Sequence, residues 1–343
     1  MLENLDSEDL NKAKEIISES KPYLELFAKH VVKPIFEKIK KKIVHDKNKN
    51  YPTEDHFEEY LERTDKKASF VNTFVYGDSQ RRLADIFIPL ELRRLDDKKP
   101  FFLIENHSEK IFELNSRFII VDTGGMGKST IVKKIFLDTI NSTSELYGIP
   151  IIVDLRRLKK INSIIQEITS LISGLGNPFD STILIEFIEE GKFIFLLDGF
   201  DEIALEEKSF VIQDVLGFIS KAPNNQFVIT SRPEDSLSNF IDFTFLDIKP
   251  LSRVQSFELI RKLGNNSDKS ENLIRKLSQG ELVNEREFLI NPLMVSLLYT
   301  AFTYKETIPL KSHNFFRQVY DAYFDAHDLS KGDDFIHEKY SKL

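Results

Sequence analysis

The middle of this chain alternates between short apolar runs and segments with helical periodicity. Strands without polar alternation are buried on both faces, as in parallel sheets that helices cover on each side. The pattern therefore predicts an α/β fold with a parallel sheet of five core strands flanked by helices. The five runs are RFIIVD (117–122), IPIIVDL (149–155), FIFLLD (193–198), QFVIT (226–230) and FTFLDI (243–248).

The chain on either side of this block has a mostly helical pattern. Residues 5–45 show helical periodicity that Pro22 and Pro34 interrupt, so we expect two or three helices there rather than one. A short helix, DHFEEYLERT, follows a polar stretch at 45–55. DIFIPLEL and PFFLIE then have the apolar character of strands, and the pattern turns helical again after residue 253.

Composition limits the classes of protein to consider. The 343 residues suffice for two or three domains, and 41% hydrophobic with 30% charged residues is usual for a soluble globular protein. A net charge of −8 argues against a general nucleic-acid binder, and the lack of cysteine excludes disulfides and thiolate metal sites. No apolar run approaches the roughly 18 residues of a membrane span, and the polar N-terminus is unlike a signal peptide, so we expect a cytoplasmic protein without membrane contact.

The sequence VDTGGMGKST lies between the first strand run and a helical segment, and it contains the GK[ST] core of a phosphate-binding loop. Its glycines allow successive N–H groups to turn toward phosphate oxygens, the Lys128 ammonium reaches the β- and γ-phosphates, and the Ser129 hydroxyl ligates Mg²⁺. The candidate nucleotide-binding residues are Thr123, Gly124, Gly125, Met126, Gly127, Lys128, Ser129 and Thr130. The alternative is a glycine-rich turn that only caps a helix.

One position departs from the full G-x-x-x-x-G-K-[ST] pattern. Asp122 stands where that pattern has its first glycine. The position is the exit of the strand rather than the phosphate cradle, and aspartate tolerates unusual φ and ψ better than most residues. We therefore expect the loop to keep its function.

Three acids crowd the end of the third apolar run, in FIFLLDGFDEI. Clustered carboxylates near a core are costly unless a cation balances them, so Asp198 is the second candidate ligand of Mg²⁺, beside Ser129. Asp201 and Glu202 are placed to orient or deprotonate the attacking water. We expect the phosphate loop and this acidic end to come from neighbouring strands; the alternative is a solvated acidic turn.

The fourth run ends in ITSRPED, which places Arg232 at the same edge of the sheet. An arginine there can bind the γ-phosphate in a bidentate manner, so we add it to the candidate catalytic residues Lys128, Asp201 and Glu202. The alternative is a surface arginine before a turn that proline ends.

Taken in order, DTGGMGKST, FIFLLDGFDE and ITSRPED resemble the NACHT family of STAND-class P-loop NTPases. FLINPLMVSLLYTAF resembles a later family helix, which implies that Pro292 lies near the adenine of a bound nucleotide. The resemblance implies five regions. They are an N-terminal helical region (1–46), a preceding segment (47–112), a nucleotide-binding α/β domain (113–250), a small helical domain (251–310) and the start of a truncated winged-helix domain (311–343).

The resemblance further implies a molecular switch, in which exchange of ADP for ATP leads to self-association and signalling, in bacterial members in defence against phage. The activating ligand and the effector are unknown. The chain lacks an N-K-x-D sequence after the phosphate loop, so ATP or ADP with Mg²⁺ is the expected cofactor. Two alternatives stay open: a scaffold that binds nucleotide without hydrolysing it, and a P-loop regulator associated with nucleic acid through the lysine-rich segment before residue 50.

Overall fold

The computed structural model describes residues 21–43, 54–72, 80–142, 148–174, 178–280 and 288–307, together with 315 and 319. These residues fall into two compact units. The first comprises Met1–Ala68, Glu91–Thr123 and Lys128–Ile248, and the second comprises Ser69–Leu90, Gly124–Gly127 and Lys249–Leu343. Each unit is described by itself below.

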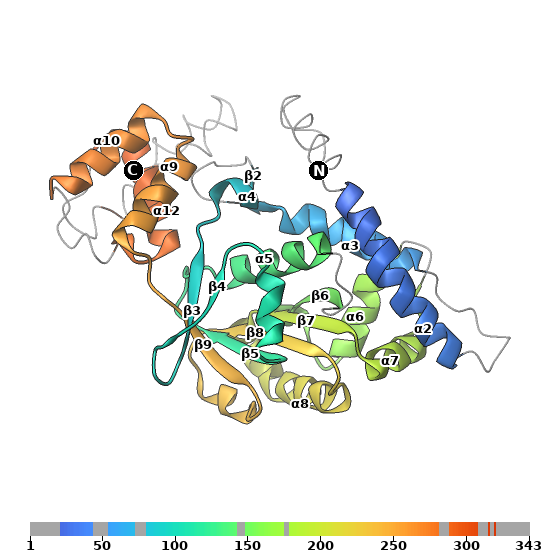
Figure 1. Ribbon diagram of the computed structural model, residues 1–343. Coiled ribbons are helices and arrows are strands. Elements are labelled where there is room, and N and C mark those ends of the chain that lie inside the picture. Colours follow the sequence, from blue (N-terminus) through green and yellow to red (C-terminus); the bar gives the residue numbers. More distant parts are fainter. Residues whose placement is uncertain are drawn as a thin grey trace, which may run out of the picture. The chain divides into compact units, whose positions relative to one another are not determined.

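The first unit is built on a mostly parallel sheet with helices packed around it (Figure 1). The strand order is β4-β3-β9-β5-β8-β7-β6. The strands are β3 (Leu90–Arg94), β4 (Pro100–Ile104), β5 (Arg117–Val121), β6 (Ile149–Asp154), β7 (Phe193–Asp198), β8 (Gln226–Ser231) and β9 (Thr244–Ile248). β5 to β9 are the five predicted strands, and their pairings with one another are all parallel. The α/β prediction is confirmed.

The sheet is wider than predicted. β3 pairs antiparallel with β9, and β4 lies beyond β3 at the edge, so the sheet has seven strands rather than five. Of the predicted strand DIFIPLEL, only the end enters β3, whereas PFFLIE forms β4. The difference arises because the apolar runs of this segment are short, and short runs do not reveal which sheet they join.

In the described part of the chain, four α-helices connect the parallel strands, and their ends follow local capping rules. They are α5 (Lys128–Asn141), α6 (Ile164–Ile172), α7 (Ser181–Glu190) and α8 (Leu205–Lys221). α7 begins at Asp180, whose side chain accepts a hydrogen bond from Thr182 N, and ends at Gly191 with φ of 83°. Between these helices the strand side chains are almost fully buried, and Phe195 packs on Phe218 and Phe227.

The N-terminal helices also belong to this unit. Residues 21–43 are helical throughout, with a π-helical turn at Ala28–Val32 followed by α2 (Lys33–Ile43). The interruption predicted near Pro34 takes the form of this π-helical turn and not of a break between helices, since the wider turn accommodates a residue that has no N–H to donate. α3 (Asp55–Ala68) confirms the helix predicted at DHFEEYLERT, and the hydroxyl of its Tyr60 accepts a 2.8 Å hydrogen bond from Ile152 N of β6.

The second unit is mostly helical. It contains a short antiparallel pair, β1 (Phe70–Asn72) and β2 (Gln80–Arg82), followed by α4 (Leu83–Ile86), α9 (Arg253–Leu263), α10 (Asp268–Ser278) and α12 (Pro292–Lys305). The helices agree with the pattern predicted after residue 253. The predicted winged-helix segment, 311–343, lies outside the described residues except for Phe315 and Val319. Among the described residues, no helix combines the length and apolar character needed to cross a membrane.

Candidate functional site

The glycine-rich loop lies where the sequence places it, between β5 and α5. Gly125 and Gly127 have φ of 81° and 101°, in the region that favours glycine, and α5 begins at Lys128. The candidate residues 123–130 thus form the loop and the first turn of a 14-residue helix, whose N-terminal N–H groups favour an anion. The alternative of a turn that only caps a helix does not explain the side chains gathered beside it.

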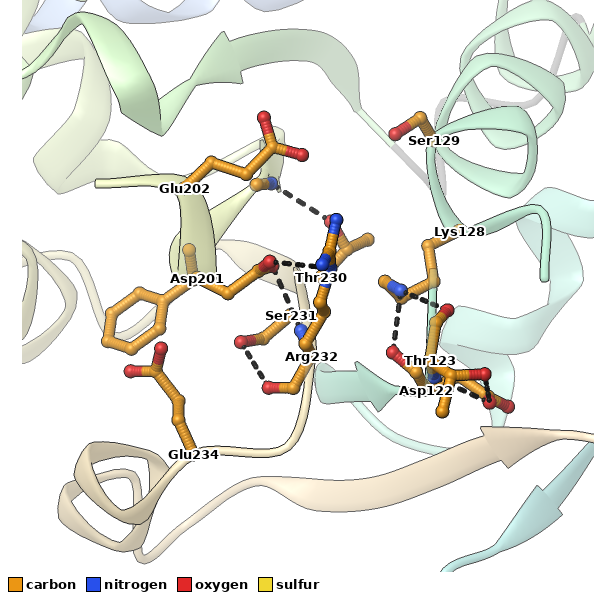
Figure 2. A network of polar contacts seen from close by, with 12 residues as sticks. Asp122, Thr123, Lys128, Ser129, Asp201, Glu202, Thr230, Ser231, Arg232 and Glu234 are labelled. Carbon is orange, nitrogen blue, oxygen red and sulfur yellow. Dashed lines mark hydrogen bonds and ion pairs between the residues drawn. The ribbon is translucent and has the colours of Figure 1, made fainter. Parts of the chain in front are cut away.

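Lys128 is bound to its own loop. Its Nζ donates to the carbonyl oxygens of Asp122 and Thr123, at 2.7 and 2.9 Å (Figure 2). Burial lowers the pKa of the ammonium, and the charge of Arg232 acts in the same direction, whereas the charge of Asp201 is the largest of those that oppose it. A further anion beside Lys128 would stabilise its charged form.

Asp122 does not have the structural role that we expected from the sequence. Its φ is not positive, so the tolerance of aspartate for unusual backbone angles is not used. Instead its carboxylate accepts hydrogen bonds from Thr123 N at 2.7 Å and from Ile248 N at 2.9 Å. Asp122 therefore joins the start of the loop to the end of β9, which a glycine could not do.

Ser129 and Asp198, the predicted Mg²⁺ ligands, lie together. Ser129 Oγ donates to Asp198 Oδ1 at 3.1 Å, and Thr230 Oγ1 donates to the same oxygen at 2.5 Å. Thr230 also accepts from Gly199 N at 3.1 Å. The expectation of neighbouring strands is wrong: β8 lies between β5 and β7, so Thr230 at its end bridges the two motifs.

The two further acids are each paired with an arginine. Asp201 Oδ1 accepts from Arg232 N at 2.9 Å, and Asp201 Oδ2 lies 3.1 Å from Arg232 Nε (Figure 2). Glu202 Oε2 lies 3.1 Å from Arg156 Nη1. The structure thus brings Arg232 to the acidic turn, as expected for one edge of the sheet, and adds an arginine that sequence reasoning missed.

Arg156 follows β6, and its guanidinium donates two hydrogen bonds to Asp154, at 2.8 and 2.6 Å, while its backbone N donates a third at 3.1 Å. These bonds to Asp154, and the charges of Asp154 and Glu202, raise the pKa of the guanidinium above its ordinary value. A signal was available: VDLRRL places a carboxylate and two arginines at the end of a parallel strand, at the same edge as the acidic motif.

Lys208 was also missed. From the first turn of α8 its Nζ donates to Phe200 O at 2.8 Å and to Glu234 Oε2 at 2.7 Å, and it lies 4.7 Å from the centre of the Phe200 ring. It connects the acidic turn to the segment after β8. Nothing in its local sequence distinguishes it from a solvated lysine on a helix.

In the second unit, α12 begins against the glycine loop. Asn291 is its N-cap: Oδ1 accepts from Leu293 N and Met294 N, while Nδ2 donates to Gly124 O at 2.9 Å. Leu293 N donates to Gly125 O at 3.2 Å. Pro292 is the first residue of this helix, where its missing N–H costs no hydrogen bond.

Gly125 is required by this close approach. A Cβ built on it would lie 2.6 Å from Leu293 Cβ and 2.8 Å from Asn291 Oδ1, besides its unfavourable φ. The predicted residues Gly125 and Pro292 therefore lie close together, although Asn291 rather than Pro292 makes the polar contact.

The donor set of the first unit fits a divalent cation. A serine hydroxyl and a carboxylate are hard oxygen ligands of the kind Mg²⁺ selects, and here they already lie 3.1 Å apart. With Lys128 and the first turn of α5 beside them, these groups can bind an anionic ligand together with its cation.

Comparison with known proteins agrees with this reading. Residues 117–267 match the model of the NACHT domain family. No curated protein matches the chain.

Solved structures match the chain at low identity. They include a signal transduction ATPase with numerous domains (STAND) protein with a tetratricopeptide repeat sensor from Pyrococcus horikoshii, with 16% identity and a TM-score of 0.36 over 62% of this chain and 31% of that one. Another is PCH-2 of C. elegans, with 13% identity and a TM-score of 0.30 over 64% of this chain and 66% of that one. A third is a mutant of RuvB from Thermotoga maritima, with 8% identity and a TM-score of 0.31 over 62% of this chain and 65% of that one. The chain thus spans about a third of the length of the STAND protein. Residues 117–267 thus match the NACHT domain family, and they contain the five parallel strands β5 to β9 of the sheet.

Proposed function

We propose that this chain binds ATP with Mg²⁺ and hydrolyses it slowly, as the nucleotide-dependent part of a signalling switch. The observation that carries the proposal is the contact between Ser129, next to the loop lysine, and Asp198 across the sheet edge. A P-loop alone would support only phosphate binding. A hydroxyl from the first turn of α5 and a carboxylate from the end of β7, brought together beside Lys128, support a metal–triphosphate ligand.

In this proposal residues 123–130 hold the phosphates through backbone N–H groups. Lys128 exchanges the carbonyls of Asp122 and Thr123 for phosphate oxygens, which are stronger acceptors because they are charged. Ser129 and Asp198 would hold Mg²⁺, which supplies neutralisation of charge on the phosphates as the terminal bond breaks. Pro292, at the start of α12, would contact the adenine.

The two acids after β7, Asp201 and Glu202, would have different roles in hydrolysis. Asp201 is engaged through both oxygens by Arg232, so we assign it to holding that arginine, which contacts the γ-phosphate. Glu202 pairs through Oε2 with Arg156, and its side chain stays 44% exposed. An accessible carboxylate oxygen can accept a hydrogen bond from water, so we assign Glu202 to orienting the attacking water.

The test compares ATP turnover and nucleotide affinity in four variants. We expect Lys128→Ala to lose affinity, and Asp198→Asn and Glu202→Gln to lower turnover by at least about 100-fold. Lys221→Ala, an exposed lysine at the end of α8, is the matched control. Turnover and affinity that are the same in Lys128→Ala and Lys221→Ala would remove the proposal.

A second function is favoured by one observation, the engagement of both Asp201 oxygens by Arg232. A carboxylate whose two oxygens both contact Arg232 is not placed to accept a proton from water, which suits a scaffold that binds nucleotide without hydrolysing it. The two functions separate in a single assay: a thermal shift with ATP but no release of phosphate favours the scaffold.

We also propose that ADP/ATP exchange controls self-association of the chain, in defence of a bacterial cell against phage, within the five regions expected from the sequence. Denaturing the purified protein and identifying the released nucleotide tests the resting state, for which we expect ADP. Light scattering with ATP and with ADP tests self-association, which we expect only with ATP.

A further inference from the structure

We propose that Asn291 is a positioning residue for the phosphate loop: its side chain orients the peptide that must donate to phosphate. This inference rests on the proposed nucleotide binding and concerns a residue 167 positions away from the loop in sequence. Asn291 caps α12, and the contacts that follow are all within the second unit.

The argument starts from the geometry of a trans peptide. Its C=O and the N–H of the next residue point in opposite directions, because the unit is planar. Gly124 O accepts from Asn291 Nδ2, so Gly125 N–H points away from α12. Gly125 O accepts from Leu293 N, so Met126 N–H does the same. Two successive loop N–H groups are therefore turned away from α12.

These two N–H groups belong to the stretch that a P-loop uses to hold phosphate oxygens. Glycine at 124 and 125 allows many peptide orientations, and the freedom that lets the loop form a cradle also lets it leave that conformation. A side chain that fixes the carbonyls removes this freedom before the ligand arrives. Affinity rises because less ordering is left to the binding step.

The same side chain also caps α12, so the two roles must be separated. Oδ1 performs the cap by accepting from Leu293 N and Met294 N, and Nδ2 holds the loop through Gly124 O. Aspartate keeps the acceptor at the same length, and caps a helix as well as asparagine, but has no donor. Serine also caps well and is neutral, but it is too short to replace the amide at Gly124.

The experiment measures affinity for ATP by calorimetry and stability by thermal unfolding, in the whole chain, for Asn291→Ser and Asn291→Asp. We expect about tenfold weaker binding in each, the equivalent of one hydrogen bond, with a melting temperature close to that of the unchanged chain. We also expect the backbone amides of residues 124–127 to exchange hydrogen faster in both variants when no nucleotide is bound. Loss of a helix cap alone would not produce this change.

Normal affinity in Asn291→Ser overturns the proposal, even if Asn291→Asp binds weakly, because charge repulsion alone explains the latter. If one variant unfolds, amide hydrogen exchange of residues 124–127 in the other variant still tests the proposal, and an unchanged exchange rate there overturns it. Failure of nucleotide binding as such is a different result: it would appear as equal affinity in the unchanged chain and in Lys128→Ala, whatever Asn291 does.

Discussion

Lys128 combines a charge that the proposed function needs with burial that opposes it. Burial lowers its pKa, so it gives up its proton at a lower pH than an exposed lysine, and a bound phosphate should restore that proton. We therefore expect ATP binding at alkaline pH to take up protons, and the affinity for ATP to fall as pH rises through the lowered pKa of Lys128. Calorimetry in two buffers that differ in ionisation enthalpy counts the protons.

The matched variant for this measurement is Lys128→Arg, since a guanidinium keeps its charge at that pH. The stability of the free protein should change in the opposite sense. The unfolded chain still holds the lysine proton between the lowered pKa and 10.5, so the free energy of unfolding rises with pH there. Equal proton uptake by the chain with Lys128 and by Lys128→Arg would contradict this account.

How far the sequence predicts the site depends on each residue's neighbours. Ser129 and Asp198 could be placed because each ends or follows a recognisable strand, and parallel strands share one active edge. Lys208 and Asn291 could not be placed, because each acts through hydrogen bonds to residues outside its own helix, including a backbone carbonyl. Such contacts leave no mark on local composition.

At the scale of elements, α8 holds the two loops of the site together through Lys208. Replacing it by methionine keeps the aliphatic stem but removes both hydrogen bonds, to Phe200 O and Glu234. The acidic turn and the Arg232 segment then lose a cross-link, so we expect turnover to fall about tenfold with nucleotide affinity within about twofold. Lys221→Met at the other end of α8 is the control, and a parallel loss of affinity would argue for general unfolding instead.

A second element, α3, is joined to the sheet by a buried hydroxyl. Burial raises the pKa of Tyr60 to about 12, and its oxygen accepts from Ile152 N. The unfolded tyrosine ionises near 10, so its stabilising contribution is complete below pH 10 and is lost as pH rises toward 12. We expect Tyr60→Phe to be less stable by about 1 kcal/mol at pH 7 and to lose less stability between pH 9 and 11, by urea unfolding. If Tyr60→Phe lost as much unfolding free energy between pH 9 and 11 as the unchanged chain, the assigned role of the Tyr60 hydroxyl would be wrong.

For the whole molecule, the sequence predicts the central strands well and the edge poorly. β5 to β9 are strongly apolar runs, because central strands of a parallel sheet are buried on both faces, and such runs predict central strands. β3 has the mixed sequence LELRR, because its position near the edge of the sheet requires apolar side chains only on one face. Its place beside β9 depends on a contact between residues about 150 positions apart, which periodicity cannot reveal.

That contact supplies the last prediction. Asp247 of β9 is 11% exposed at its side chain, and its Oδ2 lies 2.7 Å from Arg93 of β3 and 2.9 Å from Lys98. Removing Arg93 leaves a largely buried carboxylate with one exposed partner, so Arg93→Met should cost about 2 kcal/mol of unfolding free energy. Arg94→Met, one residue further along β3, breaks only an exposed pair with Asp96 and should cost less than about 0.5 kcal/mol. Equal losses in the two variants would mean that the Arg93–Asp247 pair stabilises the fold no more than the exposed pair of Arg94 does.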